Sequence, residues 1–135
     1  MTHRIKVQAE TNTTSVFSGH ITDELTGDEI LTRTSIGRVT FQRFRSVRSL
    51  VGTGNYEAAI DESEIEVPVD EYRLYDAIQP GLDYSTSSIP YTFLWRIPET
   101  REPFFEEAGT YIVVFRFYPR ESGEVERLTF EVTVS

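Results

Sequence analysis

The apolar residues of this chain recur mainly at every second position, which is the period of a β-strand. The clearest alternating run covers positions 91–97 and places Tyr91, Phe93, Trp95 and Ile97 on one face. A second run lies within 125–134 and presents Leu128, Phe130, Val132 and Val134 in the same way. The segment 110–118 precedes this run across a polar turn, so 110–118 and 125–134 are predicted to form a β-hairpin.

Further strands are predicted at 16–22, 36–47 and 64–70 from shorter alternating patterns. The pattern in 36–47 changes parity between Phe41 and Phe44, which predicts a β-bulge near Gln42 and Arg43. The segment 71–89 is irregular, and we interpret it as a long excursion over one sheet in which 71–78 can form one helical turn. About seven to eight strands in all predict an all-β antiparallel sandwich.

The predicted domain organisation is simple. Residues 1–15 form an N-terminal arm or edge strand, in which Ile5, Val7 and Ala9 alternate with polar residues, and residues 16–135 form a single domain. A chain of 135 residues is long enough to bury a core without covalent links. It contains no cysteine, which excludes disulfides, thiolate metal sites and cysteine nucleophiles.

Composition supports the β prediction and narrows the classes of partner. Val, Ile and Thr total 38 residues, whereas Ala and Leu together total 12. Val, Ile and Thr are enriched in β-strands because their branched side chains pack well on a pleated sheet. The formal charge of −9 argues against nucleic-acid binding, which needs a basic surface. The longest apolar run, 111–115, is far short of the roughly 20 residues of a membrane span. The first residues show no signal peptide, so we expect neither export nor a membrane partner.

The arginines are concentrated in one part of the chain. Positions 31–56 contain five arginines and no acid, whereas positions 57–76 contain eight acids and one arginine. Arginine is enriched at protein contacts because its planar guanidinium binds carboxylates with little loss of entropy. The cluster can therefore face either a partner or the acidic segment of its own chain. We predict a partner-docking role for Arg33, Arg38, Arg43, Arg45 and Arg48.

Strand parity supplies a second candidate docking surface. If the odd positions of 111–117 face the core, then Ile112, Val114 and Tyr118 point out of the opposite face. A strand that is apolar on both faces is normally covered on both. The cover is predicted to come either from the 71–89 excursion, through Leu74, Ile78 and Leu82, or from another subunit.

No catalytic, cofactor-binding or metal site is predicted. The two histidines, His3 and His20, are placed in the arm and in a strand. Carboxylates that are adjacent in sequence point to opposite faces of a strand and do not converge. Asp23, Asp28 and Glu29 lack the alternating spacing of a calcium loop. The chain is therefore predicted not to be an enzyme.

The segment Glu107-Ala108-Gly109-Thr110-Tyr111-Ile112-Val113 resembles the tyrosine corner of the immunoglobulin (Ig) fold. The resemblance implies that Tyr111, two residues after Gly109, begins strand F and that its hydroxyl bonds to backbone upstream. Val113 stands where the disulfide cysteine would be, which implies an Ig-like domain without a disulfide. Trp95 is too close to Tyr111 to be the strand-C tryptophan and is assigned to strand E.

A narrower resemblance rests on the order of several blocks: Phe17 to Asp23, Leu25 to Gly27, Val39 to Phe41, Ala108 to Tyr111, Phe115 to Phe117 and Thr129 to Val132. This order is similar to that of the N-terminal Ig-like domain of phage baseplate upper proteins and related virion accessory domains. The resemblance implies a non-enzymatic structural protein located in the virion, as head decoration, neck, tail or baseplate component. Its implied partners are other virion proteins or copies of itself; the location is otherwise cytoplasmic.

The alternative is a free-standing binding module. Carbohydrate recognition would use an exposed aromatic platform, for which Tyr72, Tyr75 and Tyr84 are the clustered candidates. Inhibition of an intracellular proteinase would use a rigid exposed loop, for which 99–106 is the best segment.

Overall fold

The computed structural model describes residues 4–9, 16–19, 36–48, 55–80, 91–101, 103–121 and 125–135. Within these ranges the chain forms nine strands and one short 3-10 helix, η1 (Glu99–Arg101). The strands are β1 (Arg4–Ala9), β2 (Val16–Gly19), β3 (Ile36–Arg48), β4 (Asn55–Ala59), β5 (Ile65–Glu66), β6 (Tyr72–Gln79), β7 (Tyr91–Arg96), β8 (Gly109–Pro119) and β9 (Glu126–Val134).

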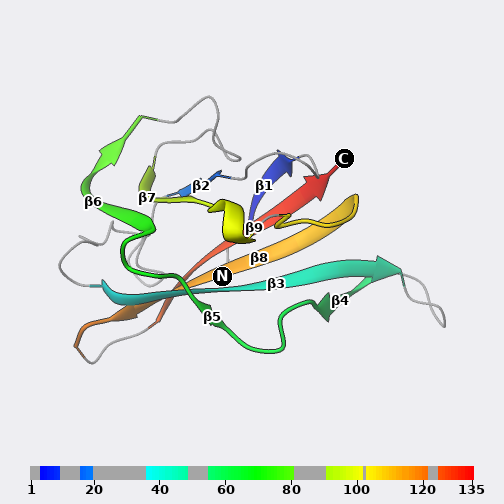
Figure 1. Cartoon of the computed structure of the whole chain (residues 1–135), viewed down its shortest axis with the longest axis horizontal. Coiled ribbons are helices and arrows are strands. Elements are labelled where there is room, and N and C mark those ends of the chain that lie inside the picture. Colours follow the sequence, from blue (N-terminus) through cyan, green and yellow to red (C-terminus); the bar gives the residue numbers. More distant parts are fainter. Residues whose placement is uncertain are drawn as a thin grey trace.

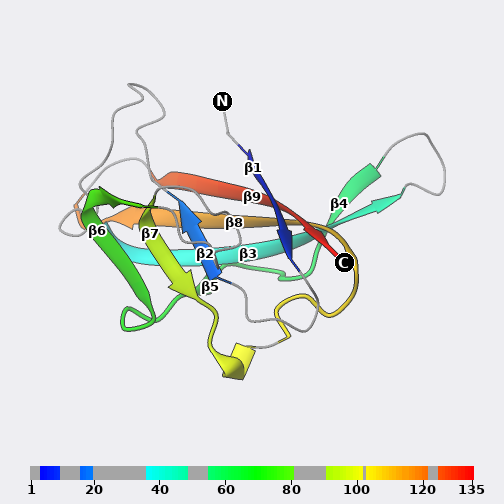
Figure 2. The same cartoon turned by 90° about the horizontal axis from the view of Figure 1, so that it is seen from above.

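The strands form two sheets. The first sheet has the order β1-β9-β8-β3-β4, with β5 also paired to β3, and the second has the order β2-β7-β6. All pairings are antiparallel except that of β1 with β9. The long strands β3, β8 and β9 run side by side (Figure 1), and β2, β6 and β7 lie against one face of them (Figure 2). The two layers confirm the predicted all-β sandwich.

The core between the sheets is built from aromatic rings. Phe115 of β8 lies among Phe17, Phe93, Trp95 and Phe130, with ring centroids separated by 5.4, 5.2, 5.9 and 5.7 Å respectively. All five side chains are fully buried. Such ring pairs add about 0.5–1.5 kcal/mol each beyond the burial of their area. The predicted core faces of β7 and β9 are confirmed, because their alternate apolar residues are all buried.

The strand order and one local motif define the fold as an Ig-like sandwich. The hairpin β8–β9 corresponds to strands F and G, and β7, which carries Trp95, corresponds to strand E. Tyr111 lies near the start of β8, and its hydroxyl donates a hydrogen bond of 2.7 Å to the carbonyl oxygen of Glu107. The tyrosine corner implied by the sequence is thus present.

The predicted bulge near Gln42 and Arg43 is wrong. Strand β3 pairs with β8 without interruption from Arg38 to Arg45, and the register shifts instead at Gly37. The bulge was inferred from the change of parity between Phe41 and Phe44, but Phe44 does not face the core. It lies opposite Ile112 on the outer face of the first sheet, which is the face directed away from the second sheet.

The predicted helical turn at 71–78 is also wrong, because this segment is strand β6. Among the described residues, β6 is an edge strand of the second sheet, and its register shifts between Leu74 and Gln79. Leu74 packs against the core rather than over β8, so the internal cover predicted for the outer face is wrong for this residue. The side chain of Ile78 and the whole of Leu82 lie outside the described residues.

Residues 4–9 of the N-terminal segment form an edge strand among the described residues, which is one of the two predicted alternatives. Strand β1 pairs in parallel with β9, from Arg4 opposite Thr129 to Ala9 opposite Val134. Val7 is buried in the core, so β1 is an integral part of the sandwich rather than a free arm.

Candidate functional site

Arg43, a predicted docking residue, is held inside its own chain. Its Nε and Nη2 donate to the two carboxylate oxygens of Asp61, each at 2.9 Å, and its main-chain N–H donates to Asp61 Oδ2 at 2.8 Å. Its Nη1 donates to the carbonyl oxygen of Phe104 at 2.8 Å. Because all three guanidinium nitrogens have internal partners, we assign Arg43 a structural role: it joins β3 to the 60–64 segment and to the loop before β8.

Arg45 is also engaged internally. Its Nη1 donates to the Glu107 carboxylate at 2.5 Å, and its Nη2 donates to the carbonyl oxygen of Ala108 at 3.3 Å. The hydrogen bond to Glu107 is the main cause of a raised pKa for Arg45. Arg43 thus faces the acidic segment of its own chain, which is the second of the two predicted alternatives. Arg45 also pairs with an acid of its own chain, but Glu107 lies outside that segment.

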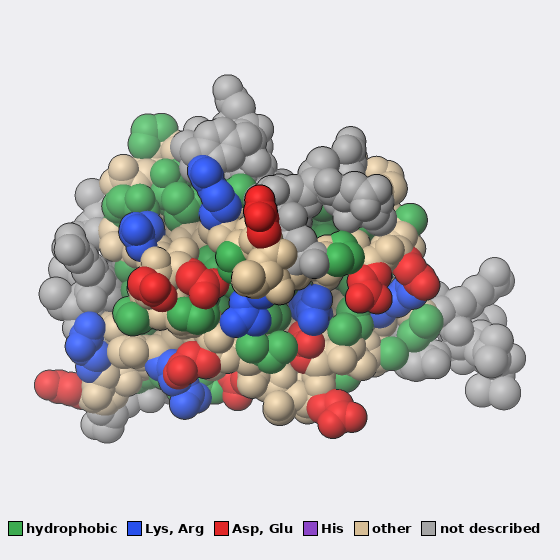
Figure 3. Space-filling view, in the orientation of Figure 1, with side chains coloured by type: hydrophobic (Ala, Val, Ile, Leu, Met, Phe, Trp, Pro, Cys, Tyr) green, Lys and Arg blue, Asp and Glu red, His purple; other side chains and the backbone are tan. Residues whose placement is uncertain are grey.

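The remaining arginines of the cluster are less constrained or lie outside the described residues. Arg38 is exposed, lies 4.2 Å from the centroid of the Tyr118 ring and approaches Glu66 at 3.8 Å. Arg33 and the side chain of Arg48 lie outside the described residues. Basic and acidic side chains are interspersed on the face shown in Figure 3 rather than separated into patches. A docking role for Arg38 stays a prediction.

The outer face of the first sheet carries a hydrogen-bonded network centred on Glu64. The Glu64 carboxylate accepts hydrogen bonds from the hydroxyls of Tyr118 and, at 2.7 Å, Thr40, and it lies 3.7 Å from Arg116 Nη1. These contacts, the Tyr118 bond above all, lower the pKa of Glu64. The Tyr118 hydroxyl is therefore already hydrogen-bonded to a residue of its own chain.

The predicted apolar docking residues of β8 differ in accessibility. Ile112 is only 3% exposed and is not available to a partner as the structure stands. Val114 is half-buried and lies between Gln42 and Thr129 on the neighbouring strands. The outer face of β8 is thus a weaker docking candidate than its composition suggested.

The residues predicted for the two alternative functions, carbohydrate binding and proteinase inhibition, are placed differently in the structure. Tyr72 is buried, and the ring of Tyr75 packs edge-on against Tyr91 at 5.7 Å, so these two residues do not form a flat exposed platform for a sugar. Tyr84 lies outside the described residues. In the 99–106 segment, Phe104 and Phe105 are buried and anchor the chain to the core. The use of this segment as an inhibitory loop stays a prediction.

No cluster that suggests catalysis or metal binding is found in the described part of the chain. Within the described ranges, no group of three or more Asp, Glu or His residues is placed to hold a metal ion. His3, His20 and the considered calcium ligands lie outside these ranges. No helix in the described ranges is long and apolar enough to span a membrane.

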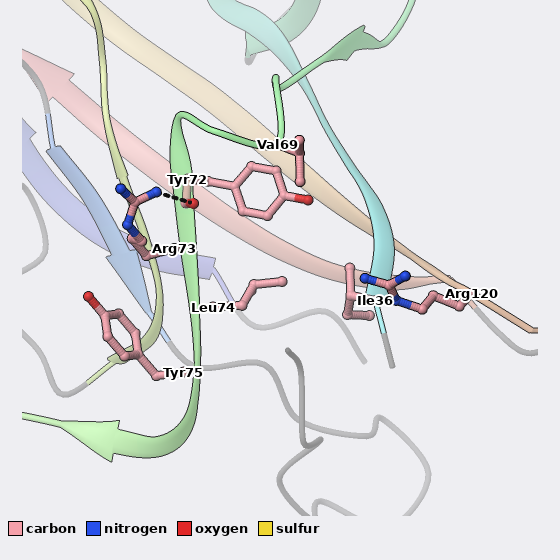
Figure 4. A pocket seen from close by; sticks show the side chains of 7 residues that line it. All are labelled: Ile36, Val69, Tyr72, Arg73, Leu74, Tyr75 and Arg120. Atoms are coloured by element: carbon pink, nitrogen blue, oxygen red, sulfur yellow. Dashed lines mark hydrogen bonds between the residues drawn. The ribbon is translucent and has the colours of Figure 1, made fainter. Parts of the chain in front are cut away.

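A pocket of about 490 Å³ lies at one end of the sandwich, among the residues that the structure describes. Its walls come from β6, from Val69 before that strand, from the first residue of β3 and from Arg120, which directly follows β8. Figure 4 shows Tyr72 and Leu74 pointing from β6 toward Ile36 and Arg120, whereas Arg73 and Tyr75 extend on the other side of the strand. The lining residues are Ile36, Val69, Tyr72, Arg73, Leu74, Tyr75 and Arg120.

Two polar groups, the Tyr72 hydroxyl and the Arg120 guanidinium, lie on the side of the pocket that also contains Ile36 and Leu74. The side chain of Tyr72 packs against Phe93 with 6.3 Å between ring centroids, and its residue is 7% exposed. Burial raises the pKa of Tyr72, an effect that the positive charge of Arg120 partly opposes. The hydroxyl therefore stays protonated near neutral pH and serves as a hydrogen-bond donor.

Arg120 is held at the pocket by the irregularity at Gly37. A Cβ atom at Gly37 would lie 3.1 Å from Cγ and 3.3 Å from Cα of Arg120, closer than most side chains tolerate. The register shift of β3 occurs at the same position. Glycine at 37 thus allows the β8–β9 hairpin to bring Arg120 against the start of β3.

Sequence reasoning missed this pocket. Tyr72 and Tyr75 were grouped together, but Ile36 and Arg120 come from distant segments that only the folded sandwich brings to β6. The alternation over 64–70 predicts that Val69, which follows Pro68, faces the core on the same side as Val67. It is 76% exposed, whereas Val67 is 2% exposed, because the chain turns at 69–71 to enter β6.

The described elements form an Ig-like β-sandwich with a pocket at one end, which is lined by aliphatic side chains together with Tyr72, Tyr75, Arg73 and Arg120. Comparisons with protein-family models, curated proteins and solved structures find no match for this chain. Support for a function therefore comes from the site and from the resemblance within the sequence.

Proposed function

We propose that this chain is a non-enzymatic assembly protein, a structural component of a phage particle that binds a neighbouring protein through the pocket end of its sandwich. The observation that carries the proposal is the exposure of Val69 at a pocket that also contains Tyr72 and Arg120. Tyrosine and arginine are enriched at protein interfaces, where the residues that contribute most to binding cluster in well-packed pockets.

A single exposed apolar residue is common on protein surfaces and needs no explanation. Val69 differs because it borders a hollow with further apolar side chains, Ile36 and Leu74, behind it. A partner side chain that enters this hollow would remove Val69 and the pocket wall from water together. Burial of apolar area contributes roughly 25 cal/mol per Å², which favours such a contact. The placement in a phage particle rests on the resemblance of the sequence blocks to virion accessory domains.

The proposal is tested by introducing a charge at the pocket. Val69→Asp should leave the thermal unfolding of the isolated chain unchanged, because the side chain is exposed, and should reduce incorporation of the chain into the native particle. The matched control is Ile60→Asp, which places the same charge on another exposed aliphatic residue outside the pocket. Incorporation is measured as chain stoichiometry in gradient-purified particles. Equal incorporation of Val69→Asp and the unchanged chain would contradict the proposal, as would an equal loss with Ile60→Asp.

A further inference from the structure

We propose that the pocket binds an acidic segment of a partner protein, in which one carboxylate is held by Arg120 and the Tyr72 hydroxyl and its aliphatic stem lies against Ile36 and Leu74. This inference rests on the proposed function and names the chemistry of the partner. It is carried by the polar groups of the pocket and by their lack of partners.

The Tyr72 hydroxyl is the first of these groups. More than nine-tenths of the residue is buried, yet the hydroxyl has no hydrogen-bond partner among the described residues. Figure 4 shows the ring directed from β6 into the pocket. The buried polar side-chain atoms without a partner among the described residues are Glu71 Oε1 and Trp95 Nε1, so the Tyr72 hydroxyl is still accessible at the pocket. It can therefore donate a hydrogen bond to an acceptor on a ligand.

Arg120 is the second group. Several described arginines approach a carboxylate of their own chain: Arg38, Arg43, Arg45, Arg101 and Arg116. Arg120 has no ion pair with any described residue, although the protein carries an excess of acids. Figure 4 shows Arg120 on the side of β6 toward which the Tyr72 ring points, and both residues line the pocket, so one ligand can contact both groups. A guanidinium and a phenol together favour an anionic acceptor.

The acids near the pocket do not neutralise this site. Glu66 raises the pKa of Tyr72 but approaches Arg38 at 3.8 Å. Asp70 and Glu121 are exposed and make no ion pair with Arg120. The apolar wall of Ile36 and Leu74 excludes a fully hydrated anion as the best ligand and favours a carboxylate on a short aliphatic stem. A glutamate side chain within a peptide has this chemistry, and a protein ligand agrees with the assembly role.

The test uses the whole chain and two probe peptides that differ in one group. Acetyl-Gly-Leu-Glu-Leu-Gly-amide is titrated by calorimetry and by NMR, and its glutamine analogue is titrated in parallel. We expect the glutamate peptide to bind with a Kd no weaker than about 1 mM and the glutamine peptide to bind about tenfold more weakly, as loss of a charge-assisted hydrogen bond predicts. Arg120→Gln should weaken the binding of the glutamate peptide about tenfold, and Tyr72→Phe should weaken it about fivefold.

Arg127→Gln is the control variant, because it removes the same charge from an exposed arginine on the outer face. Its affinity for the glutamate peptide should be unchanged. The proposal is overturned if neither peptide binds, if both bind equally, or if Arg120→Gln and Arg127→Gln have the same effect. Binding of an oligogalacturonate in preference to the peptide would also overturn it, in favour of an acidic sugar.

The outcome is separable from that of the assembly proposal. If Arg120→Gln is incorporated into particles normally while Val69→Asp is not, the pocket end is an interface but the carboxylate contact is wrong. If neither variant affects incorporation, the proposed function fails as well.

Discussion

The hydroxyl of Tyr111 donates a hydrogen bond of 2.7 Å to the main-chain oxygen of Glu107, while the carboxylate of Glu107 pairs with Arg45. One residue therefore fixes both the loop before β8 and the end of β3. The Tyr111 ring is buried and lies 4.9 Å from the ring of Phe105. This arrangement attaches the loop that carries Phe104 and Phe105 to the first sheet.

Removal of the hydroxyl alone should weaken this attachment. Tyr111→Phe is expected to lower the free energy of unfolding by about 1 kcal/mol, because a partly buried carbonyl loses its donor while the ring still fits. Chemical denaturation measures the change. An unchanged midpoint would show that the tyrosine corner contributes nothing to stability.

Gly109 is required by its backbone conformation. Its φ angle is 152°, a region that side chains disfavour, and a Cβ atom there would lie 3.4 Å from Arg45 Nη2. Gly109→Ala should therefore destabilise the fold by about 1–2 kcal/mol. Ala108→Gly is the control at the neighbouring exposed position and should change the stability by only a few tenths of a kcal/mol, roughly the entropy of a surface glycine. Equal effects of the two substitutions would contradict this account of Gly109.

The alternation of apolar residues predicted the aromatic core and the hairpin because β7, β8 and β9 each bury a regular set of alternate side chains. The tyrosine corner was also predictable, since its hydrogen bond joins residues four positions apart and depends on a local sequence. Strand β6 was not, because its irregular pairing with β7 interrupts the pattern between Leu74 and Gln79.

The interactions of the arginine cluster could not be predicted in detail for a different reason. Arg43 and Asp61 are separated by 18 positions, and their bidentate contact depends on how the chain returns after β4. The pocket depends on three distant segments and on the register shift at Gly37. The pattern of single strands carries no information on such contacts.

The Arg43–Asp61 pair should be important for stability. Asp61→Ala removes both the guanidinium contact and the acceptor of the Arg43 main-chain N–H, and it leaves a largely buried cation without its partner. We expect a loss of roughly 3 kcal/mol. Asp61→Asn keeps an acceptor and should cost clearly less. Thermal and chemical unfolding measure both, and an equal loss in the two variants would show that the charge is not involved.

Glu64 should contribute to the pH dependence of stability. Its pKa is lower in the folded chain than in the unfolded chain, mainly because of the Tyr118 hydrogen bond. The folded state therefore gains stability from the carboxylate above its unfolded pKa, and this gain is lost as the pH falls through the folded value. Glu64→Gln should reduce the loss of stability on acidification, measured as the unfolding midpoint from neutral pH downward. Glu62→Gln, at a nearby exposed position, is the control and should not reduce this loss. If the unfolding midpoint of Glu64→Gln falls with pH in parallel with that of the unchanged chain, the role assigned to Glu64 is contradicted.

The most direct test of the assembly account is photocrosslinking from the pocket mouth within intact particles. A benzoylphenylalanine placed at Val69 should form an adduct with a second protein of the particle, identified by mass spectrometry, whereas the same group placed at Ile60 should not form that adduct. The account predicts that the crosslinked peptide of the partner contains or adjoins an acidic residue. Particles that incorporate the labelled chain but yield no adduct from position 69, or the same adduct from both positions, would contradict it.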